Sequence, residues 1–302
     1  MAINLNAKFE AMDRVVRSLF ADALANKQYQ PKSGRIIEEV DSESLAEDYN
    51  WMLDTFGFRK LKQNLPIKTA AERRVTITNE PWVDNLTVDL RTMQTTQGAK
   101  YELTAKMMGR KVGPFIDNQV AGLIGADGKA FTENSWDGVP FFSDAHPMSG
   151  ATTYSNLTAG GGSPWFLFDT SVLAPIIQQW LVRPKEEAFG PETEWARNNR
   201  QVKWDFHMDM GMGMSLWWFA QCSKAALDST SFNAAMVKAM KVPTYALADG
   251  ATQLMGVMPN LLVVGPSNMT LAKELINASL NDGGGSNVNQ NAVELLILPT
   301  LG

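Results

Sequence analysis

Apolar residues recur at helical spacing in two stretches of the first 125 residues. Over residues 5–26, LNAKFEAMDRVVRSLFADALAN, they repeat at intervals of three and four with no glycine or proline between them, which predicts an amphipathic helix. Its apolar stripe would face the core of its own chain or be covered by another subunit. A longer helix is predicted from about 98 to 125. We expect Gly113 and Pro114 to interrupt it, because an interior proline kinks or breaks a helix.

Between these helices the apolar period shortens to two. Val75 and Ile77 alternate with polar residues in RVTITN, and the same alternation follows in NLTVDLR. This pattern predicts two half-buried strands. Pro81 and Trp82 lie in the linker between them, so we expect an antiparallel hairpin that turns at this linker. A ribbon of two strands is marginally stable in water, and this one would need a surface to lie on.

The second half of the chain mixes strands and helices. TAGGGSP at 158–164 predicts a flexible connector and a domain boundary. Strands are predicted at WFLF, in the early part of VKWDFHMDMGMGMSLWWFAQ, at LLVV and at VELLILP. Helices are predicted at SFNAAMVKAM, capped by Ser231, and in NMTLAKELIN. The segment IIQQWLV fits either a short strand or a helix end. Together these elements indicate an α+β fold.

The composition is that of an ordinary globular protein. Apolar residues make up 45% of the 302 positions and charged residues 20%, which excludes a disordered chain. The length suits one large domain or two of ordinary size. No stretch approaches the ~18 uncharged apolar residues of a membrane helix. The first residues lack the pattern of a signal peptide, so we expect no membrane partner.

Charge is unevenly distributed along the chain. The net charge of −5 argues against nucleic-acid binding as the main role, because strong binders cluster lysine and arginine. Residues 38–54 carry seven carboxylates and no basic residue, whereas residues 59–74 carry six basic residues against one glutamate. These blocks could pair within one chain, pair with a second copy, or form two solvated faces.

The two histidines of the chain each have an aspartate at a spacing of two. Asp144 precedes His146, and Asp209 follows His207. Residues two apart share a face of a strand, so the four side chains could bind zinc or iron in a metal-dependent hydrolase. However, such short patterns arise often by chance, and His146 before Pro147 is typical of a rigid loop. We therefore expect no catalytic site, no metal site and no cofactor.

Other catalytic patterns are weaker still. The single Cys222 excludes an internal disulfide and a cysteine-cluster metal site. The glycine runs AGGGS and DGGGS lack the lysine of a phosphate-binding loop. The alternating glycines of MGMGMS have no strand–helix unit around them. We expect that the protein is not an enzyme.

Several segments, in order, resemble one known family. WDGVPFFSDAHP looks like a loop of the pattern DG-x-x-FF-x-x-x-HP. MMGR precedes it, and PWFLFDTSVLAPIIQQWLVRP, LLVVGPSNMTLAKELIN and VELLILPTLG follow it. The chain thereby resembles the major head (capsid) protein family of Mu-like bacteriophages, which has the HK97-like fold. The resemblance covers essentially the whole chain.

The resemblance implies a division of the chain into segments. These are an N-terminal arm at 1–51, an extended loop at 52–92 with Pro81 and Trp82 at its tip, a peripheral domain at 93–164 with a spine helix at 98–125, a mainly axial domain at 165–285, and a closing strand at 286–302 that returns to the peripheral domain.

The implied function is that of a major capsid protein of a tailed bacteriophage or prophage. Such a protein assembles in the bacterial host cytoplasm, as hexamers and pentamers, into an icosahedral head enclosing double-stranded DNA that it does not bind specifically. Scaffolding, portal and decoration proteins are further partners in this family. An encapsulin-like protein compartment and the metal-dependent hydrolase are the alternatives.

The charged blocks suggest where subunits meet. The extended loop would lie on a neighbouring subunit, and the acid-rich segment offers it a partner of opposite sign. We expect contacts between two sets of residues on adjacent copies, the first basic and the second acidic: Arg59, Lys60, Arg73 and Arg74 with Glu43, Glu47 and Asp48.

Overall fold

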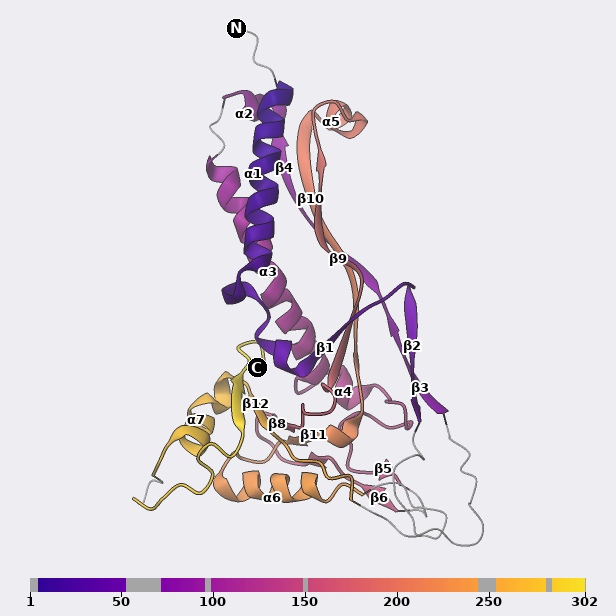
Figure 1. The fold of residues 1–302 in the computed structure, drawn as a ribbon, viewed down its shortest axis with the longest axis vertical. Helices are drawn as coiled ribbons and strands as arrows, with labels where there is room; N and C mark the ends of the chain where they lie inside the picture. The colour runs from indigo at the N-terminus through magenta and orange to yellow at the C-terminus, as the bar shows by residue number, and fades with distance from the viewer. Residues whose placement is uncertain are drawn as a thin grey trace.

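The computed structural model describes residues 5–52, 72–95, 99–148, 152–243, 254–280 and 284–301. Figure 1 shows a tall, narrow part, with two long helices beside a sheet of long strands, standing on a broader part that holds a second sheet. The chain begins at the far end of the tall part, and its C-terminus lies where the two parts meet.

Two helices form one side of the tall part. Helix α1 (Leu5–Ala25) packs along α3 (Ala99–Ile124), and both predicted helices are confirmed. The buried side of α1 is covered by the chain's own residues, since Phe9 stacks on Trp204 and Phe20 lies against Phe206. The apolar stripe of the first helix is therefore used within the chain.

Helix α3 runs unbroken through Pro114, so the predicted interruption is wrong. A Cβ on Gly113 would lie 2.0 Å from the carbonyl oxygen of Tyr29. This glycine is therefore a point of close approach to the short helix η1 (Lys27–Tyr29). Proline removes one hydrogen bond from a helix, and packing on both sides of α3 outweighs that loss.

The sheet of the tall part has the strand order β1-β9-β10-β4. Its long strands β9 (Ile176–Phe189) and β10 (Gln201–Met214) pair antiparallel, with α5 (Glu194–Asn199) between them. β1 (Ile37–Asp41) lies parallel to β9 at one edge, and β4 (Glu80–Asp89) lies antiparallel to β10 at the other. The ambiguous segment IIQQWLV is thus a strand.

The sheet of the broader part has the order β13-β12-β8-β11-β7. Its strands are β7 (Leu157–Thr158), β8 (Trp165–Phe168), β11 (Ala220–Ser223), β12 (Leu261–Val264) and β13 (Glu294–Ile297). Two helices accompany it, α6 (Ser229–Met240) and α7 (Met269–Asn277). Strands and helices predicted here are confirmed, except that α6 is capped by Asp228, with Ser231 as the other half of a capping box.

The remaining described elements are short. They are η2 (Lys32–Ile36), α2 (Leu90–Thr95), α4 (Lys129–Thr132), β5 (His146–Pro147), β6 (Thr153–Tyr154), η4 (Trp217–Phe219) and η5 (Pro266–Asn268).

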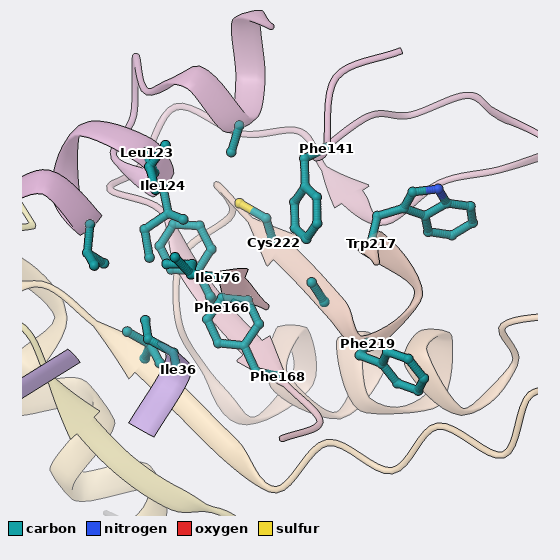
Figure 2. Close-up of a cluster of buried hydrophobic side chains, with 14 of the residues drawn as sticks. Ile36, Leu123, Ile124, Phe141, Phe166, Phe168, Ile176, Trp217, Phe219 and Cys222 are labelled. Atoms are coloured by element: carbon teal, nitrogen blue, oxygen red, sulfur yellow. The ribbon is translucent and has the colours of Figure 1, made fainter. Parts of the chain in front are cut away.

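A hydrophobic cluster joins the two parts. Figure 2 shows Leu123 and Ile124 of α3 and Ile176 of β9 together with Phe166 and Phe168 of β8. Because side chains from both sheets share this core, the two parts support each other. Burial at ~25 cal/mol per Å² makes such a shared core the main source of stability.

The predicted boundary near residue 164 does not separate two units. β7 precedes the glycine run 158–164 and β8 follows it, yet both belong to one sheet, where each pairs with β11. In addition, β9 and β10 lie in the sheet of the tall part although they fall within 165–285. The chain crosses between the two parts several times, and local composition does not record such crossings.

The predicted hairpin between residues 74–79 and 85–91 is wrong. β3 (Glu72–Thr78) pairs with β2 (Ala46–Met52), whereas β4 pairs with β10. Pro81 and Trp82 stand inside β4, opposite Asp209 and Met208, and are not at a tip. Proline is tolerated there because β4 is an edge strand. Partners distant in sequence decided the pairing.

Candidate functional site

His146 is fully buried and both of its ring nitrogens are occupied. Nδ1 lies 2.7 Å from Oδ2 of Asp137, and Nε2 lies 3.0 Å from Oδ1 of Asn156. The ring stacks on Trp217, with centroids 3.9 Å apart. Its partner is therefore Asp137, whereas Asp144, two residues before His146, is exposed.

The hydrogen bonds of Asn156 fix the protons of this group. Its Nδ2 donates to the carbonyl oxygen of Phe141, and its Oδ1 accepts from the backbone N–H of Ser143. Oδ1 therefore accepts from Nε2–H of His146, while Nδ1 faces Oδ2 of Asp137. No ring nitrogen is left for a metal ion. We call His146, Asp137 and Asn156 the His146 pin, which links the described segments 137–148 and 152–156.

His207 and Asp209 lie in β10 of the tall part and not beside the pin. His207 lines an apolar cavity of about 190 Å³ with Phe20, Trp82 and Phe115. Within the described ranges, no three histidine, cysteine, aspartate or glutamate side chains gather as metal ligands. The four residues of the predicted metal site are not brought together.

Cys222 is a packing residue of β11. It is buried in the cluster of Figure 2, which also holds Phe141, and it pairs with Phe166 of β8 in the strand register. Burial raises the pKa of its thiol well above the usual range, so the thiolate needed for nucleophilic attack is suppressed.

The β2–β3 ribbon differs from these buried groups because most of its side chains face solvent. Asp48, Asn50, Arg74 and Thr76 are all exposed, whereas Ile77 is 3% exposed. Arg74 pairs with Asp48 at 3.3 Å on the same ribbon. In Figure 1 the ribbon stands to the right of the long strands, on the side away from α1.

The other charged residues predicted for subunit contact have different surroundings. The carboxylate of Glu47 accepts hydrogen bonds from the hydroxyls of Ser42 and Ser44, which lower its pKa. Glu43 is exposed beside them. Arg59 and Lys60 lie outside the described residues, as does the side chain of Arg73.

The ribbon leaves the body where β1 continues into β2 and β3 continues into β4. Asn79, the one residue between β3 and β4, is 5% exposed and ties the two crossings together. Its Nδ2 donates to Oγ of Ser42 at 3.1 Å and to the carbonyl oxygen of Ser44 at 2.8 Å. Its backbone N–H donates to the carbonyl oxygen of Leu45.

Sequence reasoning missed the residues that hold both regions in place. Asp137 could have been found, because it stands in the same WDG-to-HP motif as His146. Asn156 and Asn79 carried no signal, since their roles depend on residues that only folding brings near. No helix among the described residues is long and apolar enough to cross a membrane.

Comparison with solved structures places the fold. The chain is similar to the procapsid protein of bacteriophage JBD30, with a TM-score of 0.79, 25% identity, and coverage of 98% of this chain and 99% of that chain. It is also similar to the JBD30 capsid, with a TM-score of 0.78, 19% identity and 94% coverage of each chain. A third match is the JBD30 capsid decorated with minor capsid protein trimers, with a TM-score of 0.75, 19% identity, and coverage of 94% and 93%.

The long helix, the tall sheet and the projecting ribbon thus belong to an α+β phage capsid protein of the HK97-like fold. None of the curated proteins matches the chain. The family model described as Mu-like prophage major head subunit gpT matches residues 9–301, and the chain belongs to this family. It is a major capsid protein of the virion and not an enzyme, and neither the protein-filled compartment nor the hydrolase is favoured.

Proposed function

We propose that the chain forms hexamers and pentamers that close into the icosahedral head of a tailed phage or prophage around double-stranded DNA. The observation that carries the proposal is the β2–β3 ribbon. It projects from the body with charged side chains exposed, and a ribbon of two strands is marginal without a surface to lie on. We propose that a neighbouring subunit supplies that surface.

The predicted segments are adjusted accordingly in this proposal. The arm at 1–51 would end in β2. The extended loop at 52–92 would include β3, and its last part, β4, would join the tall sheet. The peripheral domain would hold α3 and the long strands β9 and β10. The axial domain would be the five-stranded sheet with α6 and α7. Residues 286–302 would supply its edge strand β13 and then return towards α3, where the hydroxyl of Thr300 donates to the carbonyl oxygen of Asp117.

Opposite charges would set the register between subunits. We keep the proposed basic set of Arg59, Lys60, Arg73 and Arg74 and the acidic set of Glu43, Glu47 and Asp48. Asp48 already pairs with Arg74 in its own chain, so Glu43 is the acid with the best access. Exposed pairs contribute only about 0–1 kcal/mol each, so buried apolar area would supply most of the affinity.

The remaining partners follow from the same role. The similar JBD30 capsid carries minor capsid protein trimers, which supports a decoration protein here too. Scaffolding and portal proteins would act during assembly in the host cytoplasm. The net charge of −5 suits a lining that does not grip phosphates, so packaged DNA can move.

Expression of the whole chain in bacteria tests the proposal. Electron microscopy and sedimentation are expected to show closed shells. The charge reversal R59E/K60E is expected to reduce shell yield while thermal unfolding of the subunit is unchanged. K241E, a reversal at the exposed residue that follows α6, serves as the control. A compact monomer at every concentration would contradict the proposal.

A further inference from the structure

β3 crosses the face of the tall sheet at two glycines. A Cβ on Gly211 would lie 2.5 Å from the carbonyl oxygen of Thr78, and a Cβ on Gly213 would lie 2.6 Å from Cγ1 and Cδ1 of Ile77. Such distances do not occur between real atoms without a shift. The absent side chains therefore leave a hollow in β10 that holds Ile77.

Gln179 completes this hollow from the adjacent strand. It stands opposite Gly211 in the β9–β10 register, so the two positions share one face of the sheet. Its Nε2 donates to the carbonyl oxygen of Ile77 at 2.9 Å, and its Oε1 accepts from the hydroxyl of Tyr49 at 3.1 Å. One fully buried amide thereby binds both strands of the ribbon. We call Gly211, Gly213 and Gln179 the ribbon seat.

Besides the seat, Val75 of β3 packs against the hydrophobic cluster that joins the two parts. Beside the seat, a cavity of about 340 Å³ separates β3 from the α4 region, with Thr76 on one side and Lys129 and Glu133 on the other. The direction in which the ribbon projects therefore depends on how β3 is held at the ribbon seat. A small displacement at Thr78 is therefore carried to the far end of the ribbon.

We infer that the ribbon seat sets the angle at which the β2–β3 ribbon leaves the body, and that assembly depends on this angle. Gly211, Gly213 and Gln179 are then positioning residues, since they act through the ribbon. The inference rests on the proposed contact between the ribbon and a neighbouring subunit. It also gives the alternating glycines of MGMGM a structural role, because Gly211 and Gly213 leave room for β3.

The two glycines are expected to respond differently. At Gly211 the added methyl group would meet main-chain oxygen, so G211A can be accommodated only by moving β3. At Gly213 it would meet the end of the Ile77 side chain, so combining G213A with I77A relieves the conflict. The I77A change does not relieve G211A, because the oxygen of Thr78 remains.

Shell yield and ribbon direction are measured separately. Nitroxides at N50C on β2 and E187C on β9 report the distance between ribbon and body in unassembled subunits, because the buried Cys222 is not labelled. G211A is expected to shift this distance distribution and abolish shells with the unfolding temperature of the body retained. G213A is expected to give fewer shells than the unaltered chain. In the I77A background, the same change is expected to reduce shell yield far less, so G213A/I77A is compared with I77A alone. G122A, at a glycine of α3 with open space around it, is the control and is expected to change neither.

Each outcome decides the inference. An unchanged distance distribution with full shell yield in G211A would overturn it. If G211A gives no folded subunit, Q179M replaces it, because this change removes both hydrogen bonds without adding bulk. A broadened nitroxide distance distribution and loss of shells are then expected. An unchanged distribution with full shell yield would contradict the inference. Failure of the unaltered chain to form shells would refute the proposed function, while the distance measurement still tests the seat.

Discussion

The His146 pin and the β2–β3 ribbon both carry charged side chains, but they place them in opposite environments. In the pin, the side chains of His146 and Asp137 are 0% exposed, and their polar atoms find partners within the same loop. On the ribbon, the side chains of Arg74 and Asp48 are 71% and 44% exposed. The polar groups of the pin are therefore satisfied within one chain, whereas the ribbon leaves its charges exposed to solvent.

This contrast matches the two demands on a shell subunit. The body must keep its conformation when it contacts neighbouring subunits. Buried polar groups whose hydrogen bonds are all satisfied help here, because they specify one arrangement of the core. The segments that contact neighbouring subunits must be accessible before assembly. Their charged groups therefore cannot all be buried and paired within their own chain. A protein that only had to be stable would gain nothing from a projecting two-stranded ribbon.

Thiol labelling should give the largest difference between the two regions. Cys222 in the body is buried and burial raises its thiol pKa, so it reacts only when the core opens. With opening free energies above about 4 kcal/mol, labelling by a disulfide reagent should be at least ~1000-fold slower than at N50C on the ribbon. Comparable rates would show that the body is not closed around β11.

Breaking the pin should give the next largest effect. D137A leaves Nδ1 of the buried His146 without its partner and is expected to cost about 3 kcal/mol of unfolding free energy, measured by denaturant titration. D144A is the matched control, because Asp144 is exposed, and should change stability by less than about 0.5 kcal/mol. Equal losses for both variants would show that Asp137 has no special role at His146.

A charge exchange on the ribbon should have a smaller effect on stability. R74E places two carboxylates together and should cost no more than about 1 kcal/mol, since the pair is exposed. The double change R74E/D48R restores an attractive pair within the chain. If shell yield recovers in the double variant, Arg74 acts only within its own ribbon. If yield stays low, as the proposal expects, Arg74 also meets an acidic residue of a neighbour.

Acidification should give the smallest effect, at the turn between β1 and β2. Hydrogen bonds from Ser42 and Ser44 lower the pKa of Glu47 below its ordinary value of 4.5. The stabilisation is therefore present above that ordinary value and is lost as the pH falls through the lower pKa of the folded state. Amide exchange at residues 42–47 should quicken over that window, and E47Q should abolish the dependence.

Local sequence patterns were sufficient for the elements themselves. The period of 3.6 located α1 and α3, and short continuous apolar runs located β8, β12 and β13. The order of motifs also indicated the capsid family, which the family model over residues 9–301 confirms.

The sequence by itself thus determined the main helices, several of the strands and the family they form. The tertiary structure decided which strand pairs with which, that Asp137 and not Asp144 binds His146, and that two glycines of β10 receive β3. Those choices depend on groups more than a hundred residues apart, such as Gln179 and Ile77, or on a loop whose path is set by its packing on Trp217. Periodicity shows which face of a segment is buried and which faces solvent. It contains no information about which other segment packs against the buried face.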